Sequence, residues 1–123
     1  MEITVREMKQ DDVEAAAAIF FESFNSFNAS VGLAPEWPNL EFCRNVILGF
    51  IEHPGYKAFV ALDGKGRVIG SNFLEFHDSV AAPGPISVEA GEQNRGAGRL
   101  LMLASIDCAW ALGKTSIRGV QVT

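Results

Sequence analysis

The chain has 123 residues, of which 48% are hydrophobic, and its formal net charge is −5 at pH 7. A chain of this length suits one domain, and its share of apolar side chains is enough to build a core, which excludes a disordered tail. The negative charge argues against general nucleic-acid binding, because phosphate backbones attract basic surfaces.

Neither a leader nor a membrane anchor is apparent in the sequence. Met1 leads directly into a strand-like stretch from Glu2 to Met8, without a basic region followed by a long apolar one. No run approaches the roughly 18 apolar residues of a membrane span. Cys43 and Cys108 lie in apolar helical contexts, which favours reduced, buried thiols over a disulfide framework. We therefore expect a cytoplasmic protein with no membrane partner and no nucleic-acid partner.

The stretch from Glu2 to Met8 predicts a first strand, and a helix is expected to follow it. Gln10–Asp12 supplies hydrogen-bond acceptors and negative charge at the start of this helix, which should run to about Asn25 or Asn28. Aromatic side chains recur along it at spacings of three and four residues and predict a stripe that faces the core: Phe20, Phe21, Phe24 and Phe27.

The middle of the chain predicts a loop, a second helix and a hairpin. Ser30–Asn39 contains glycine and two prolines and is expected to be a loop, while Leu40–Glu52 is expected to be a helix that a His-Pro-Gly sequence ends. Tyr56–Leu62 and Arg67–Phe76 have the composition of strands. Asp63-Gly64-Lys65-Gly66, which lies between them, is a strong hairpin signal.

The last third predicts a turn at Ala81–Pro85, a strand over Pro85–Ala90, an apolar helix over Arg99–Leu112 and a final strand over Ser116–Thr123. The resulting order is β-α-α-β-β-β-α-β. We expect an α/β protein of the α+β kind, with a mixed, mainly antiparallel sheet flanked by helices, in a single domain over residues 1–123.

The segment Gln93-Asn94-Arg95-Gly96-Ala97-Gly98 predicts a phosphate-binding loop between a strand and a helix. Glycines let the backbone turn tightly and approach a ligand, and the free amides and positive dipole end of the following helix attract an anion. A Walker loop is excluded, because Arg99 and Leu100 follow the last glycine instead of lysine and Ser or Thr. A Rossmann fingerprint needs three glycines in another register and a βαβ unit.

In this setting the segment resembles the QxxGxG/A signature of the GNAT superfamily, the Gcn5-related N-acetyltransferases. Val88-Glu89-Ala90-Gly91-Glu92 stands where that family often has V-x-P-x-Y, with Ala90 in place of the proline and Glu92 in place of the aromatic residue. Gly98 to Met102 resembles the family's usual helix opening. The order of the elements agrees with the family from Ile3 to Val122.

The resemblance implies acetyl-CoA as cosubstrate, with its pyrophosphate bound by backbone amides of the loop and by the charge of Arg95 or Arg99. It also implies that the fourth strand separates from the fifth, so that backbone groups near the end of the fourth strand pair with the pantetheine chain. Val88 N–H is the expected oxyanion donor. The expected acetyl-CoA-binding residues are Ser87, Val88, Gln93, Asn94, Arg95, Gly96, Ala97, Gly98 and Arg99.

Glu89 is the candidate general base, because it alternates away from the apolar face of Ile86 and Val88. Three further groups near strand ends could also relay a proton: Glu75, His77 and Glu92. No metal is implied, since two histidines and two cysteines are scattered without ligand spacing. A serine hydrolase is poorly supported, since the sequence has no GxSxG motif.

Members of the family normally continue past the fifth strand with a helix and two strands, and that helix commonly carries a tyrosine that protonates the leaving thiolate. The only tyrosine here is Tyr56, at the start of the second predicted strand, so this role is not carried over. We therefore expect a GNAT-like fold truncated after the fifth strand, either cut or completed by a partner. The apolar side chains of Ile117, Val120 and Val122 favour pairing with another chain, as in a homodimer.

The predicted function is an acetyl-CoA-dependent N-acetyltransferase, in which a small-molecule or peptide amine attacks the thioester directly. Two alternatives stay open. One is a noncatalytic acyl-CoA-binding or regulatory module, because the phosphate-binding loop is present without the acid-bearing segment. The other is a structural half-domain that a partner chain completes. The sequence does not identify the acceptor.

Overall fold

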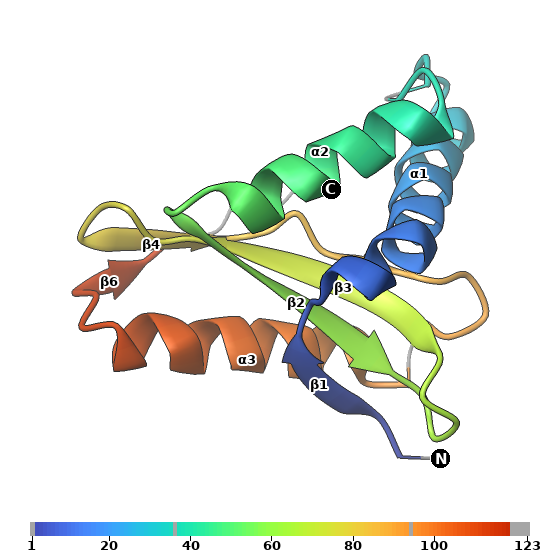
Figure 1. Ribbon diagram of the computed structural model, residues 1–123. Helices are drawn as coiled ribbons and strands as arrows, with labels where there is room; N and C mark the ends of the chain where they lie inside the picture. The colour runs from blue at the N-terminus through green and yellow to red at the C-terminus, as the bar shows by residue number, and fades with distance from the viewer. Residues whose placement is uncertain (1, 36, 94, 119–123) are drawn as a thin grey trace.

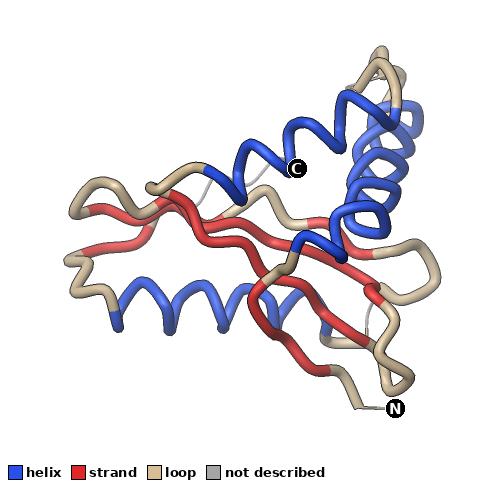
Figure 2. The backbone as a smooth tube through the Cα atoms, in the orientation of Figure 1, coloured by secondary structure: helices blue, strands red, loops and turns tan. Residues whose placement is uncertain are grey.

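The computed structural model describes residues 2–35, 37–93 and 95–118, which form three layers (Figure 1). A twisted sheet lies in the middle. Helices α1 (Val13–Ser30) and α2 (Leu40–Glu52) cover one face of this sheet, and α3 (Ala97–Ala111) runs along the other face, as Figure 2 shows. No helix in the described part of the chain is long and apolar enough to cross a bilayer.

The sheet is mixed and mainly antiparallel, as expected. Its strands are β1 (Thr4–Glu7), β2 (Tyr56–Leu62), β3 (Val68–Glu75), β4 (Val80–Pro83), β5 (Ser87–Val88) and β6 (Ser116–Ile117). They lie in the order β1-β2-β3-β4-β6, and β5 pairs separately with β3. All pairs are antiparallel except β4 with β6. The expected last strand is thus confirmed at Ser116–Ile117, whereas Val120 and Val122 lie outside the described residues.

A β-bulge separates β4 from β5 and corrects two predictions. Leu74 pairs with Pro83 and Ser71 pairs with Ser87, so three steps along β3 face four steps along the partner. One extra residue is therefore inserted around Gly84. The turn expected at Ala81–Pro85 is wrong for its first three residues, which belong to β4, and the expected strand Pro85–Ala90 is only two residues long. The structure thus has six strands where the sequence predicted five, because the bulge breaks the alternation that identifies a strand.

The two expected helices before the sheet are confirmed. α2 has the predicted bounds, since the Asn39 side chain accepts a hydrogen bond from Phe42 N–H at 2.8 Å and so caps its start. α1 extends to Ser30, a little further than expected. Of its aromatic stripe, Phe20 is buried and Phe21 and Phe24 are partly buried, but Phe27 is 42% exposed. The stripe faces the core over its first part only.

Hydrophobic cores lie on both faces of the sheet. On the α1/α2 face, Phe20 and Ile47 pack in one cluster with Phe73 of β3. On the α3 face, Leu101 packs in a second cluster with Ile69 of β3. Because successive strand residues point to opposite faces wherever the register is regular, these two clusters show which side of the sheet a strand residue faces.

Candidate functional site

The sheet has a notch between β5 and β6. In the described part of the chain, β6 pairs with β4 at Val80 and Ala81, and Arg118 N–H donates to the Ala81 carbonyl at 2.8 Å. β5 pairs only with β3 in the described part of the chain. Glu89 N–H donates to the Ile69 carbonyl of β3 at 2.8 Å, so the preceding N–H and C=O of Val88 point away from β3, into the notch. Among residues 2–35, 37–93 and 95–118, β5 and β6 are therefore unpaired with each other, which agrees with the separation of strands that the resemblance implied.

The glycine-rich segment closes one end of this notch and begins α3. Gly96 has a φ of +94°, in the left-handed region that favours glycine, and its carbonyl accepts the first helical hydrogen bond, from Leu100 N–H at 3.0 Å. The amides of the first helical turn therefore have no acceptor within the helix and are available to an anion. Loop and notch together form a pocket of about 460 Å³, the cradle pocket, lined by Ile86, Val88, Glu92, Gln93, Gly96, Gly98 and Arg99.

The structure brings most of the predicted acetyl-CoA-binding residues together at the cradle pocket. Arg95 is exposed beside the pocket, and Ala97 is buried beneath it. The Ser87 hydroxyl lies 3.3 Å from that of Ser71 and is buried, and the backbone N–H and C=O of Ser87 point toward β3, because they alternate with those of Val88. Asn94 lies outside the described residues.

An arginine engages the carboxylates next to the cradle pocket. Arg67, at the start of β3, approaches Glu89 at 2.5 Å and Glu92 at 3.5 Å. The candidate base Glu89 is thus held in an ion pair. It lines a second pocket of about 310 Å³ against α1, together with Glu22, Ser23 and others. The Ser23 hydroxyl donates to the Val88 carbonyl at 3.2 Å, so α1 anchors β5.

A third pocket of about 290 Å³ lies beside the bulge. It is lined by Tyr56, Glu75, Ala82, Pro83, Gly84, Pro85 and Arg118, and we call it the bulge pocket. The Tyr56 hydroxyl donates to Glu75 Oε2 at 3.0 Å, and His77 Nδ1 lies 3.6 Å from Glu75 Oε1. Burial, followed by the hydrogen bond to Glu75, raises the pKa of Tyr56 above its usual value.

Sequence reasoning did not place Tyr56 in a site, because its contact depends on an irregularity of the β2–β3 hairpin. The hairpin between β2 and β3 sets Tyr56 directly opposite Glu75, and Glu75 directly opposite Ala82 of β4. Directly paired residues point to the same face of a sheet. The strand bounds predicted from the sequence would pair Leu62 with Arg67 and so Tyr56 with Phe73. The observed register is shifted between Ala61 and Leu62, and this shift is what brings the two polar side chains together.

Two further observations limit the chemistry of the site. No cluster of three or more His, Cys, Asp or Glu side chains that could hold a metal ion occurs among residues 2–35, 37–93 and 95–118. Both cysteines are free thiols, Cys43 buried and Cys108 partly buried, and burial raises the pKa of each. A thiolate nucleophile is therefore not favoured.

Neither a protein-family model nor a curated protein matches the sequence. Solved structures do. A GCN5-related N-acetyltransferase from Kribbella flavida is 27% identical, with a TM-score of 0.72 over 94% of this chain and 69% of that one. An aminoglycoside acetyltransferase from an uncultured soil metagenomic sample is 20% identical, with a TM-score of 0.69 over 100% of this chain and 82% of that one.

A third structure, of AAC(6')-Iy in complex with the bisubstrate analogue CoA-S-monomethyl-acetylneamine, is 14% identical and has a TM-score of 0.77 over 99% of this chain and 81% of that one. Acetyltransferases of this fold thus match nearly the whole chain. The chain therefore has the fold of GNAT acetyltransferases, as the resemblance of its glycine-rich segment implied.

Proposed function

We propose that the chain is an acetyl-CoA-dependent N-acetyltransferase, in which an amine attacks the acetyl thioester directly. The observation that carries this proposal is the continuity of the cradle pocket with the free edge of β5. A diphosphate suits the amides at the start of α3. The amide-containing pantetheine arm suits the edge of β5, where Val88 N–H points away from β3. AAC(6')-Iy, a structural neighbour, binds a CoA bisubstrate analogue, which supports the proposal.

The residues of the cradle pocket fit such a cosubstrate. Gly96 allows the loop to turn with its backbone exposed, and the N–H groups of Ala97 and Gly98 face an anion at the positive end of the helix dipole. Arg99 lines the pocket and adds positive charge. The Glu92 carboxylate is unfavourable to phosphate, but Arg67 at 3.5 Å offsets its charge.

Backbone groups of β5 would hold the acyl part of the cosubstrate. Val88 N–H points into the notch, and Ser23 fixes the orientation of the same peptide segment through the Val88 carbonyl. A fixed N–H donor of this kind stabilises the negative charge that develops on an acyl oxygen under attack. Acyl transfer then needs no covalent intermediate with the protein, because the site has only to position two reactants and move protons.

Calorimetric titration of CoA into the chain tests the cradle pocket. Gly96→Asp adds a negative charge beside the expected diphosphate and should weaken CoA binding at least tenfold. Gly113→Asp is the matched control, because Gly113 also has a positive φ and open space around it, at the opposite end of α3. Equal CoA affinities of the two variants would contradict the assignment.

A noncatalytic acyl-CoA-binding module is the second candidate, and the ion pair that engages Glu89 favours it. The two candidates differ in a thiol-release assay with acetyl-CoA and a panel of amines. An N-acetyltransferase releases CoA in proportion to the amine, whereas a binding module shows CoA affinity without amine-dependent release. A chain without affinity for CoA would favour the half-domain that a partner chain completes.

A further inference from the structure

The bulge pocket lies at the far end of the notch from the phosphate-binding loop and on the other face of the sheet. Tyr56 packs against the core of the α1/α2 face, and Glu75 points to the same face because the two are directly paired. Ile86 and Val88, which line the cradle pocket, pack against the core of the α3 face. The free edge of β5 lies between the two pockets. A ligand that follows this edge away from the loop therefore ends at the bulge pocket.

The carboxylate in the bulge pocket has one fixed oxygen and one accessible oxygen. Tyr56 donates to Glu75 Oε2, and the Tyr56 ring is held by Phe50 and His53 at centroid distances of 4.9 and 5.1 Å. Within the described ranges, His77 Nδ1 is the charged or polar partner recorded for Oε1, at 3.6 Å, and the Glu75 side chain is 34% exposed. Unlike Glu89, Glu75 has no arginine ion pair among the described residues.

We propose that the bulge pocket receives the acceptor, a small primary monoamine, and that Glu75 removes the proton of its ammonium group, with Tyr56 as a positioning residue. This inference rests on the proposed acetyl transfer. A volume of about 290 Å³ lies at the low end for ligand pockets, so it suits a compact amine. Glu75 and Arg118 are the charged residues that line it, and because their charges offset each other the pocket favours a single positive charge over a polyamine.

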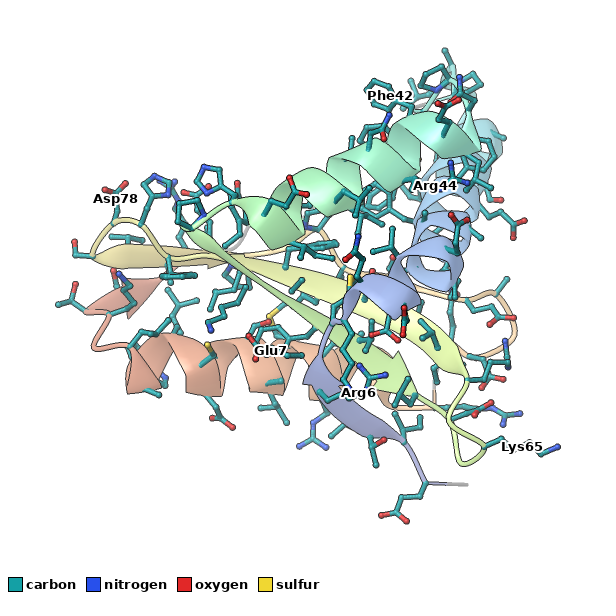
Figure 3. All side chains as sticks on the ribbon, in the orientation of Figure 1. Arg6, Glu7, Phe42, Arg44, Lys65 and Asp78 are labelled. Atoms are coloured by element: carbon teal, nitrogen blue, oxygen red, sulfur yellow. The ribbon has the colours of Figure 1, made fainter. Side chains whose placement is uncertain are left out.

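The other titratable groups around the pair do not change this assignment. His53 contacts Tyr56 from the end of α2 with its ring edge-on. His77 and Asp78 follow β3, and Asp78 lies on the exposed turn before β4 (Figure 3). Neither lines the bulge pocket. Glu75 is therefore the group in the pocket that can accept a proton from the ammonium.

The proton balance of the transfer assigns one step to Glu75. The ammonium gives one proton to Glu75 Oε1, which passes it to solvent. The freed nitrogen lone pair forms the C–N bond with the acyl carbon, and the C–S bond breaks with its electron pair leaving on sulfur. The nitrogen then loses a second proton, which ends on the thiolate. The products are the amide, the free thiol and one proton in solution.

Enzyme-dependent CoA release with butylamine, spermidine and hydroxylamine tests the inference. Hydroxylamine is largely uncharged at neutral pH and needs no base to free its lone pair. We expect the wild-type chain to prefer butylamine over spermidine. Glu75→Gln should lower kcat with butylamine about 100-fold or more, with KM for acetyl-CoA unchanged, and should retain the rate with hydroxylamine. Tyr56→Phe keeps the ring and should lower the butylamine rate about tenfold.

Glu52→Gln is the matched control, because it removes the same charge from an exposed position at the end of α2 and should leave all three rates unchanged. The inference is overturned if Glu75→Gln lowers the butylamine and hydroxylamine rates alike, or lowers neither. It is also overturned if the wild-type chain prefers spermidine. A wild-type chain that acetylates none of the three contradicts the proposed acetyl transfer itself, so the two failures are distinguishable.

Discussion

Substitution of Gly70 by alanine is expected to displace β5 and so to damage the notch. Gly70 is buried on β3 directly opposite Val88. A Cβ atom there would lie 2.8 Å from the Ser87 carbonyl oxygen and 3.2 Å from Leu101 Cδ1. A side-chain atom at this distance could rotate away from the new Cβ atom, whereas the Ser87 carbonyl belongs to the backbone and can move only with β5. Relief therefore requires β5 to move away from β3.

The expected cost follows from two opposing terms. Overpacking of a tight core costs about 1–3 kcal/mol. Replacement of a strand glycine gains about 0.5–1 kcal/mol, because the unfolded chain loses freedom. The net destabilisation is thus about 1–2 kcal/mol, which for a chain of 123 residues lowers Tm by about 4–8 °C. Gly49→Ala is the control, since Gly49 lies within α2 with no atom within 4 Å of its Cβ position, and Tm should rise by about 2–4 °C.

Thermal melts by circular dichroism, together with CoA titrations, measure both consequences. Gly70→Ala should lower Tm and weaken CoA binding, because Val88 moves with β5. Gly49→Ala should raise Tm and leave the CoA affinity unchanged. A Gly70→Ala variant as stable as Gly49→Ala, with unchanged CoA binding, would refute the argument that β5 is held at van der Waals distance from β3.

Two other predictions concern stability and association. The hydrogen bonds from Arg6 hold the pKa of Asp12 below its usual value. Ionised Asp12 therefore stabilises the fold fully above the unfolded pKa of about 3.9. This stabilisation is lost as the pH falls through the lower pKa of the folded state. Asp12→Asn should therefore cost about 1–3 kcal/mol at neutral pH in urea titrations, and a difference from wild type that persists undiminished at strongly acidic pH would contradict this. In the described part of the chain β6 pairs only with β4, so we expect β6 to associate with a second chain. Light scattering over a concentration series should show dimers, and a stable monomer whose Ser116–Ile117 amides exchange rapidly would oppose the idea.

Local signals in the sequence predicted the helices and the glycine-rich turn before α3. Asn39 and the His-Pro-Gly sequence mark the ends of α2, and Asp63 fixes the hairpin by accepting hydrogen bonds from Lys65 and Arg67 N–H, both at 2.9 Å. Gly96 precedes α3, which begins at Ala97, two residues before the predicted start. In each case the residues that determine the structure are neighbours in the chain.

What could not be predicted depends on contacts between distant residues. Arg67 reaches Glu89 across 22 positions, and a sequence pattern does not show that this carboxylate is engaged. β4 was missed because Ala81 and Val88 both face the α3 core although an odd number of residues, seven, separates their positions. A single alternating pattern cannot describe both. The expected roles of Glu89 and Val88 in catalysis remain predictions.

Because of the bulge, the site depends on the number of residues between Pro83 and Ser87 and not only on their side chains. Loss of one residue between Pro83 and Ser87 would restore a continuous register, with Val88 still opposite Gly70, but it would remove the backbone bend at Gly84 that lines the bulge pocket. No single substitution has that effect. Sequences that share this site should therefore vary in the residues between these two positions but keep their number, and related active chains with insertions or deletions there would argue against this constraint.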